Sequence, residues 1–222
     1  MAKKAHSTNV SGPKRDFKLS RRLEKHVATW KACTLCPLHK QAQHHVLYRG
    51  SIPATTLLIG EAPGSTEDLV GEPFIGRAGK LLDHLLDDLS IRLLADGKVV
   101  AHRELGSRCI VNVLACAPWE DFKSRSVRAP SKEEAAACRP RVEELFDLIQ
   151  PSRVILLGKT AAKLVPKRLT EGSPVIGMPT RLVVEVVHPA FLLRKGGTES
   201  LDYKRCLLHL KDFFSAPCVA PF

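Results

Sequence analysis

The stretch at residues 56–79 reads TLLIGEAPGSTEDLVGEPFIGRAG and contains the patterns from which the fold class follows. It opens on a short apolar run, as in a buried parallel strand, and continues into a long loop rich in glycine and proline. From residue 77 onward apolar side chains recur at helical spacing, which predicts a helix. Strand, long loop and helix in this order indicate a parallel α/β unit, and a connection of this length is usually functional.

Three further apolar runs, at residues 109–114, 153–157 and 182–187, predict three more strands separated by helical patterns. The expected fold is therefore α/β: a three-layer α/β/α sandwich around a central, mainly parallel four-stranded sheet. Parallel sheets of this kind bind ligands at the carboxyl ends of their strands. Those ends carry Glu61, Asn112 and His188.

The chain has 222 residues, of which 44% are hydrophobic, so it can bury one good core. We expect one domain over residues 21–214, preceded by a basic, disordered arm (residues 1–20) and followed by a tail (residues 215–222). The formal net charge of +11 favours a polyanionic partner. Neither a membrane span nor a secretory signal is recognisable, which predicts a cytoplasmic protein that is not secreted. We also expect a monomer.

Seven cysteines in a reducing compartment indicate a metal or cluster site rather than disulfides. Cys33 and Cys36 form a C-x-x-C pair, in which two thiolates can share one metal. The next candidates, Cys116 and Cys138, are separated by 21 residues. The other three cysteines lack partners at ligand spacing and are interpreted as packing or tail residues: Cys109, Cys206 and Cys218.

The loop at residues 60–79 lacks the Gly-Lys-Ser/Thr of a Walker sequence, which disfavours nucleoside triphosphate binding. It resembles the first motif of the family 4 (iron-sulfur) uracil-DNA glycosylases. Three further segments resemble that family in the right order: IVNVLAC (110–116), VILLGKTAA (154–162) and HPAFLLR (188–194). The resemblance implies a uracil-DNA glycosylase fold and a monofunctional base excision repair enzyme that acts on the chromosome. Such an enzyme hydrolyses the N-glycosidic bond of deoxyuridine in single- or double-stranded DNA, releases uracil and leaves an abasic site.

By this resemblance Phe74 stacks on the flipped uracil, although a loop phenylalanine can also serve the core alone. Asn112 is polar within an apolar strand, and its amide can donate to O4 and accept from N3-H, which cytosine would reverse. His188 is implied to donate to O2 of the departing uracil. The alternatives are a satisfied buried Asn112 and a structural His188.

Water activation is less well defined. The best-known uracil glycosylases carry a water-activating Asp at the position where this chain has Ala62. Family 4 members also lack this Asp, so Ala62 agrees with the resemblance but leaves the base unnamed. Glu61 is the first candidate base, with Glu67 and Asp68 behind it; each could instead only orient the loop. We expect Ala62, Glu67 and Asp68 to lie around the substrate.

The family places an apolar wedge at Leu192 and Leu193, which could alternatively pack in the core, and a phosphate contact at Arg194. A basic stretch at residues 123–131 supplies further expected DNA contacts: Lys123, Arg125 and Arg128.

The resemblance also implies a [4Fe-4S] cluster on Cys33, Cys36, Cys116 and Cys138. The gap between the last two is somewhat wider than is usual in the family, so a four-cysteine zinc site and unligated thiols stay open as alternatives.

A related branch crosslinks to uracil-DNA through a His in a basic insert, and Val127 stands where that His would align. A valine is no nucleophile, which favours turnover. The alternative function is a uracil-DNA binding, crosslinking or damage-sensing protein with little turnover.

Overall fold

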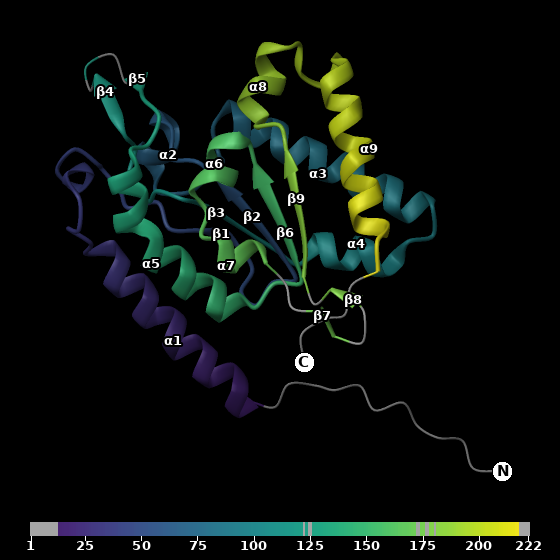
Figure 1. The fold of residues 1–222 in the computed structure, drawn as a ribbon, viewed down its shortest axis with the longest axis horizontal. Helices are drawn as coiled ribbons and strands as arrows, with labels where there is room; N and C mark the ends of the chain where they lie inside the picture. The colour runs from purple at the N-terminus through teal and green to yellow at the C-terminus, as the bar shows by residue number, and fades with distance from the viewer. Residues whose placement is uncertain are drawn as a thin grey trace.

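The computed structural model describes residues 13–121, 123, 126–171, 174–175, 178–179 and 181–217. Its centre is a five-stranded sheet with the order β1-β3-β2-β6-β9. The four longer strands are β2 (Thr56–Gly60), β3 (Arg108–Asn112), β6 (Arg153–Leu157) and β9 (Leu182–Val186), and they are mutually parallel. Their arrows in Figure 1 point towards the end of the molecule that carries α6 and α8.

The four parallel strands confirm the expected α/β fold, but the count of four was one short. The fifth strand, β1 (Arg49–Gly50), pairs antiparallel with β3 and has only two residues. A segment that short contains no periodic pattern, so the sequence could not reveal it. The strand expected at residues 109–114 also ends early, because Val113 and Leu114 leave the ladder and donate to the carbonyls of Gly60 and Glu61.

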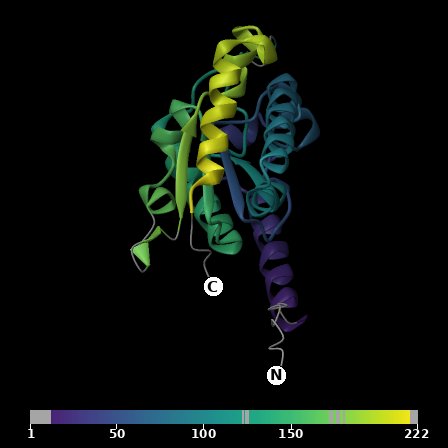
Figure 2. The same ribbon diagram turned by 90° about the vertical axis from the view of Figure 1, so that its right-hand side faces the viewer.

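One face of the sheet is covered by α3 (Arg77–Ala95), α4 (Val99–Gly106), α8 (Pro189–Arg194) and α9 (Leu201–Ser215). Leu58 and Ile155 point into this layer, where the leucines of α3 supply most of the buried apolar surface. Seen from the side in Figure 2, α3 and α9 lie next to each other.

The opposite face is covered by α5 (Lys132–Ile149), α6 (Lys159–Leu164) and α7 (Lys167–Thr170). The neighbours of Leu58 along the strand, Leu57 and Ile59, point into this second layer, as the two-residue alternation of a strand requires. The expected capping box begins α5: Ser131 accepts from the Glu134 amide at 3.1 Å, and Glu134 accepts from the Ser131 amide at 2.9 Å. Both faces of the sheet are thus buried, which makes three layers.

Helix α1 (Pro13–Lys31) lies alongside α5 (Figure 1). The expectation of a disordered arm over residues 1–20 is wrong for residues 13–20, which are helical, while residues 1–12 lie outside the described part. The error arose because the apolar periodicity starts only at Leu19, whereas the helix begins at a proline, which suits a first helical turn.

The remaining elements are short and connect the larger ones: η1 (Pro37–Lys40), α2 (Ser65–Val70), β4 (Trp119–Asp121), β5 (Ser126–Val127), β7 (Pro174–Val175), β8 (Met178–Pro179) and η2 (Gly197–Glu199). Among the helices that are described, none has the length and apolar character needed to cross a membrane.

Candidate active site and cysteine cluster

A cavity of about 510 Å³ opens at the carboxyl ends of the parallel strands. Eight of the predicted site residues line it: Glu61, Ala62, Glu67, Phe74, Asn112, Arg128, His188 and Arg194. These residues come from segments up to 133 positions apart, from Glu61 to Arg194. The topology joins them because β2, β3, β6 and β9 all end at this edge.

Phe74 and Asn112 meet over Gly60. A Cβ placed on Gly60 would collide with Asn112 Oδ1 and with the Phe74 ring, so only glycine leaves both side chains in place. Phe74 is 5% exposed and has a φ of 56°, a left-handed value that is uncommon outside glycine. Strained backbone of this kind is retained where the surroundings fix it, often at a binding site.

Helix α3 holds the Phe74 loop from the other side. A Cβ on Gly79 would overlap the backbone carbonyl of Phe74, so this glycine lets the helix pass directly against the loop. Glu67 stabilises the same loop, because its Oε1 accepts from the amides of Ile75 at 3.1 Å and Gly76 at 2.8 Å.

The Asn112 side chain is almost completely buried, yet its Oδ1 has no hydrogen-bond partner among the described residues. A buried amide oxygen without a partner is destabilising by about 1–3 kcal/mol, so such an atom at a cavity wall indicates a ligand that donates to it.

His188 caps the N-terminus of α8, where its Nδ1 accepts from the Ala190 amide at 3.1 Å. Because Nδ1 is the acceptor, the neutral ring carries its proton on Nε2. Burial, and secondly the positive charge of Arg194, lower the pKa of His188. The site therefore holds a neutral imidazole with one N–H donor, and its ring centroid lies 5.9 Å from that of Phe74.

Two carboxylates line the cavity. Glu67 is already committed to two loop amides, which fits the alternative that it orients the loop. Glu61 directly follows β2 and is partly exposed at the wall. Asp68 is not part of the lining: it is fully buried, and its Oδ1 accepts from the Gln43 amide at 3.1 Å.

The expected DNA contacts divide into several groups. Arg194 is exposed at the cavity wall and Lys123 is exposed in the turn between β4 and β5. Arg128 lies at the wall but forms two hydrogen bonds with Glu134, at 2.9 and 2.6 Å. Arg125 lies outside the described residues.

The wedge predicted at Leu192 is wrong. Leu192 is completely buried in the core beneath α8 and is not available to enter DNA. Leu193 is only partly buried against that core, so it stays a candidate.

Among the lining residues that the sequence did not predict, two have polar side chains, Lys159 and Thr160, which begin α6 after the turn at Gly158. Both belong to the segment VILLGKTAA and follow the carboxyl end of β6. Their position after a parallel strand was the available signal.

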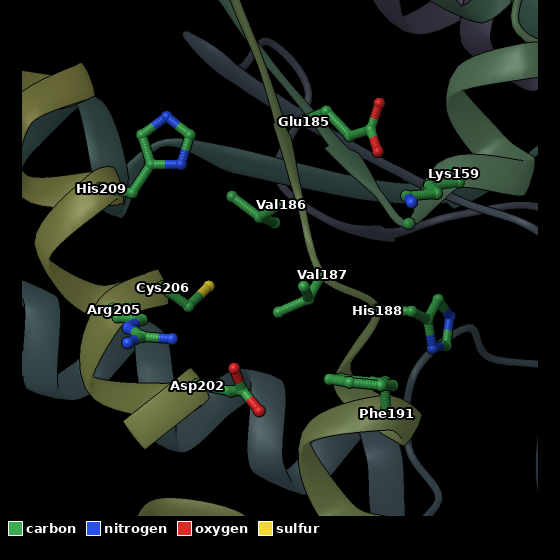
Figure 3. Close-up of a pocket in the computed structure, with 11 residues that line it drawn as sticks. Lys159, Glu185, Val186, Val187, His188, Phe191, Asp202, Arg205, Cys206 and His209 are labelled. Carbon is green, nitrogen blue, oxygen red and sulfur yellow. The ribbon is translucent and has the colours of Figure 1, made fainter. Parts of the chain in front are cut away.

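A second cavity, of about 600 Å³, lies on the other side of His188, between β9 and α9 (Figure 3). Val186, Val187 and Cys206 form its apolar part, and the His188 ring points away from α9 in this view. Lys159 lines both cavities.

The four predicted ligand cysteines line one small, apolar cavity: Cys33, Cys36, Cys116 and Cys138. Burial first, and then the neighbouring cysteines, raise the pKa of Cys116 to about 12. The free thiols therefore keep their protons unless a cation compensates the thiolates. Among the described residues, no three or more His, Cys, Asp or Glu side chains converge closely enough for a single metal ion.

A fully buried arginine, Arg141, borders the same cavity. Within the described part of the chain it forms no ion pair with a carboxylate. An unpaired buried cation is costly, whereas thiolates bound to a cluster would balance it. The donor set and its charge environment therefore fit an anionic thiolate cluster.

A family model described as the uracil DNA glycosylase superfamily matches residues 47–211. The chain belongs to that superfamily. It is 34% identical over 175 residues to a type-4 uracil-DNA glycosylase of Thermotoga maritima, covering 76% of this chain and 82% of the relative. Its identity to a type-4 uracil-DNA glycosylase of Pyrobaculum aerophilum is 32% over 177 residues, 74% of this chain and 81% of the relative. Another relative of that description, from Archaeoglobus fulgidus, is 35% identical over 134 residues, 60% of this chain and 58% of the relative.

Proposed function

We propose that this protein excises uracil from DNA: it hydrolyses the N-glycosidic bond of deoxyuridine, releases uracil and leaves an abasic site for base excision repair. The observation that carries the proposal is the unpartnered, buried Oδ1 of Asn112, set beside the Phe74 ring at the wall of the cavity. The names of the similar type-4 enzymes support it.

The base must leave the stack to reach this cavity, and the Phe74 ring gives it an aromatic surface on which to stack. Asn112 Oδ1 accepts from N3-H of uracil. Cytosine presents an acceptor at N3, which would face the same oxygen without a proton between them. The buried amide therefore selects uracil, because binding cytosine would leave two hydrogen-bond acceptors facing each other at a cost in free energy.

As the glycosidic bond breaks, negative charge develops on the uracil ring. His188 donates from Nε2 to O2, and because the neutral ring is already fixed by the Ala190 amide, no reorganisation is needed during the reaction. Glu61 is the carboxylate that orients the attacking water. We expect the DNA strand to stay uncut, because the proposed hydrolysis does not form a Schiff base between a lysine and the sugar.

Arg194 and Lys159 hold the DNA backbone beside the cavity, and the exposed Lys123 is a further phosphate contact. Arg125 stays an expected contact outside the described residues. Val127 also lines the cavity and offers no nucleophilic atom, which supports turnover rather than covalent capture. We take the protein to act as a monomer on chromosomal DNA in the cytoplasm.

We further propose a [4Fe-4S] cluster held by Cys33, Cys36, Cys116 and Cys138. The four thiols line one cavity, and the buried Arg141 beside them would balance the negative charge of thiolates bound to a cluster. When bound, the cluster supplies a structural crosslink between the segment after α1, the segment after β3 and α5.

The test is a labelled oligonucleotide with one uracil, incubated with the protein and then treated with heat and alkali. Strand cleavage after this treatment, but not before it, is expected. An intact strand at enzyme excess, with binding retained, would instead support the damage-sensing alternative.

His188→Ala sharpens this test. It should lower the single-turnover rate by roughly 10²–10³-fold, the effect of losing one transition-state donor, with little change in DNA binding. His84→Ala, on the exposed surface of α3, is the matched control. Equal losses of rate and of binding would remove His188 from the chemical step.

A further inference from the structure

Arg141 connects the cysteine cavity with the segment that positions Asn112. It lies on α5, one turn after Cys138, and its side chain is completely buried. On one side Arg141 lines the small cavity formed by the four cysteines, Cys138 among them.

The other side of the guanidinium binds backbone carbonyls. Nη2 donates to the carbonyl of Asn112 and, at 3.1 Å, to that of Val113, while Nη1 donates to the carbonyl of Leu47 at 3.1 Å. Asn112 and Val113 are the residues at which β3 leaves the sheet. The Arg141 side chain thus donates to two successive carbonyls at the end of β3, where the hydrogen bonds between strands stop.

This clamp bears directly on base reading. The orientation of the Asn112 amide depends on the backbone that carries it, and its Oδ1 lies so close to Gly60 that a Cβ there would collide with it. A planar guanidinium can hold several carbonyls in fixed directions, whereas a lysine ammonium cannot.

We infer that Arg141 is a positioning residue that couples the occupied cysteine site to base recognition by Asn112. It serves as the buried counter-ion of the thiolates on one side and fixes the Asn112 backbone on the other. The inference rests on the proposed function, since it assumes both a cluster on the four cysteines and uracil reading by Asn112.

Two substitutions separate the two tasks. Arg141→Lys keeps a positive charge but loses the planar guanidinium that donates to several carbonyls. Iron content and visible absorbance should therefore persist. Single-turnover uracil release should fall by roughly 10–100-fold, as for other residues that support a site from behind. Arg141→Met removes the charge as well and should also lower the iron bound per chain.

A double-mutant cycle identifies the route of the effect. In an Asn112→Ala background, Arg141→Lys should change the rate less than about twofold, because the amide that Arg141 positions is already gone. A purely structural role would instead give the same fold-loss in both backgrounds.

Arg153 provides a matched control. It is also a buried arginine that donates to backbone carbonyls, those of Phe213 at 2.8 Å and Ala216 at 3.0 Å, but it lies at the start of β6, the end of the strand opposite the cavity. Arg153→Lys should lower Tm and leave the rate of the folded enzyme and its iron content unchanged.

The outcomes are distinct. Active, iron-containing wild-type protein whose rate is unaffected by Arg141→Lys, or whose cycle is additive, overturns the coupling and leaves the proposed function standing. Wild-type protein that releases no uracil overturns the coupling together with the proposed function. Wild-type protein that releases uracil but holds no iron overturns the coupling and the proposed cluster, and leaves uracil excision standing.

Discussion

At the scale of single residues, the site depends on which side-chain atoms have a hydrogen-bond partner within the protein and which do not. Asn112 Oδ1 is buried without a partner among the described residues, and His188 Nδ1 is committed to the Ala190 amide. Asn112 Oδ1 can therefore accept a hydrogen bond from a ligand. Because His188 Nδ1 is an acceptor, the single N–H of the neutral ring is on Nε2. In the proposed function, base recognition and stabilisation of the leaving uracil therefore both depend on neutral groups, the Asn112 amide and the His188 imidazole.

Gly60→Ala tests the close packing beneath this pair. The added methyl would displace Asn112 Oδ1 or the Phe74 ring, so uracil release should fall by at least roughly tenfold and stability by about 1–3 kcal/mol. Gly106→Ala, where a Cβ meets no atom within 4 Å, is the control. Oligonucleotide assays and thermal denaturation measure the two effects, and unaltered activity in Gly60→Ala would show that the close packing is not needed.

The pH dependence of catalysis tests the state of His188. Burial and Arg194 lower its pKa below the ordinary 6.5, so the neutral ring persists, and the acid-side fall in rate should begin below that pH. Arg194→Gln removes a charge that opposes protonation, so the pKa should rise and the acid limb should move to higher pH. Single-turnover rates between about pH 4 and 8 measure this.

Arg103→Gln is the control for that experiment, because Arg103 is exposed on α4, which leads into the opposite end of β3. A limb that stays in place, or moves to lower pH, in Arg194→Gln would contradict the assignment.

At the scale of elements, short helices and turns after the parallel strands present the charged groups to DNA. Arg194 ends α8 and is exposed, whereas Arg128 is held by Glu134 at the start of α5. The pair joins the segment after β5 to α5, so Arg128 contributes to local structure first. Arg194 is thus free to contact a DNA phosphate, whereas Arg128 is already paired with Glu134, although the sequence alone does not distinguish the two arginines.

The salt dependence of DNA binding separates these two arginines. Arg194→Ala should reduce the slope of log K against log salt by about 1, because one phosphate is no longer neutralised, while Arg128→Ala should leave it nearly unchanged. Fluorescence anisotropy at several salt concentrations provides the slopes. A reduction of about 1 in both variants would place Arg128 at the phosphates as well.

At the scale of the whole molecule, the cysteine site joins parts of the chain that contribute to different layers. Cys33 and Cys36 follow α1, Cys116 follows β3, and Cys138 lies on α5. Trp30 also links α1 to α5 through Nε1, which donates to Glu144 at 2.6 Å. Loss of the site should therefore loosen α1 before it disturbs the sheet.

Cys138→Ser should lower the iron content and Tm together, and limited proteolysis should then cut first near α1. Cys206→Ser, a buried thiol in α9 away from the cluster cavity, should retain full iron content. Iron analysis, visible absorbance and circular dichroism measure these effects. Equal iron in both variants would exclude Cys138 as a ligand.

Much of the fold was predictable because its signals are local in sequence. Continuous apolar runs marked the four parallel strands, and a capping box marked the start of α5. Two-residue β1 carries no periodicity, and the helix over residues 13–20 has few apolar positions, so neither could be seen.

By itself, the sequence determined the fold class and the group of residues that gather at the carboxyl edge, since parallel strands all end on one side. Tertiary structure alone decided what each residue is free to do. Burial removed Leu192 from the DNA surface, and neighbours committed Glu67, Asp68 and Arg128 to structural bonds. It also revealed Arg141 beneath Asn112, because partners and solvent access depend on segments that are distant along the chain.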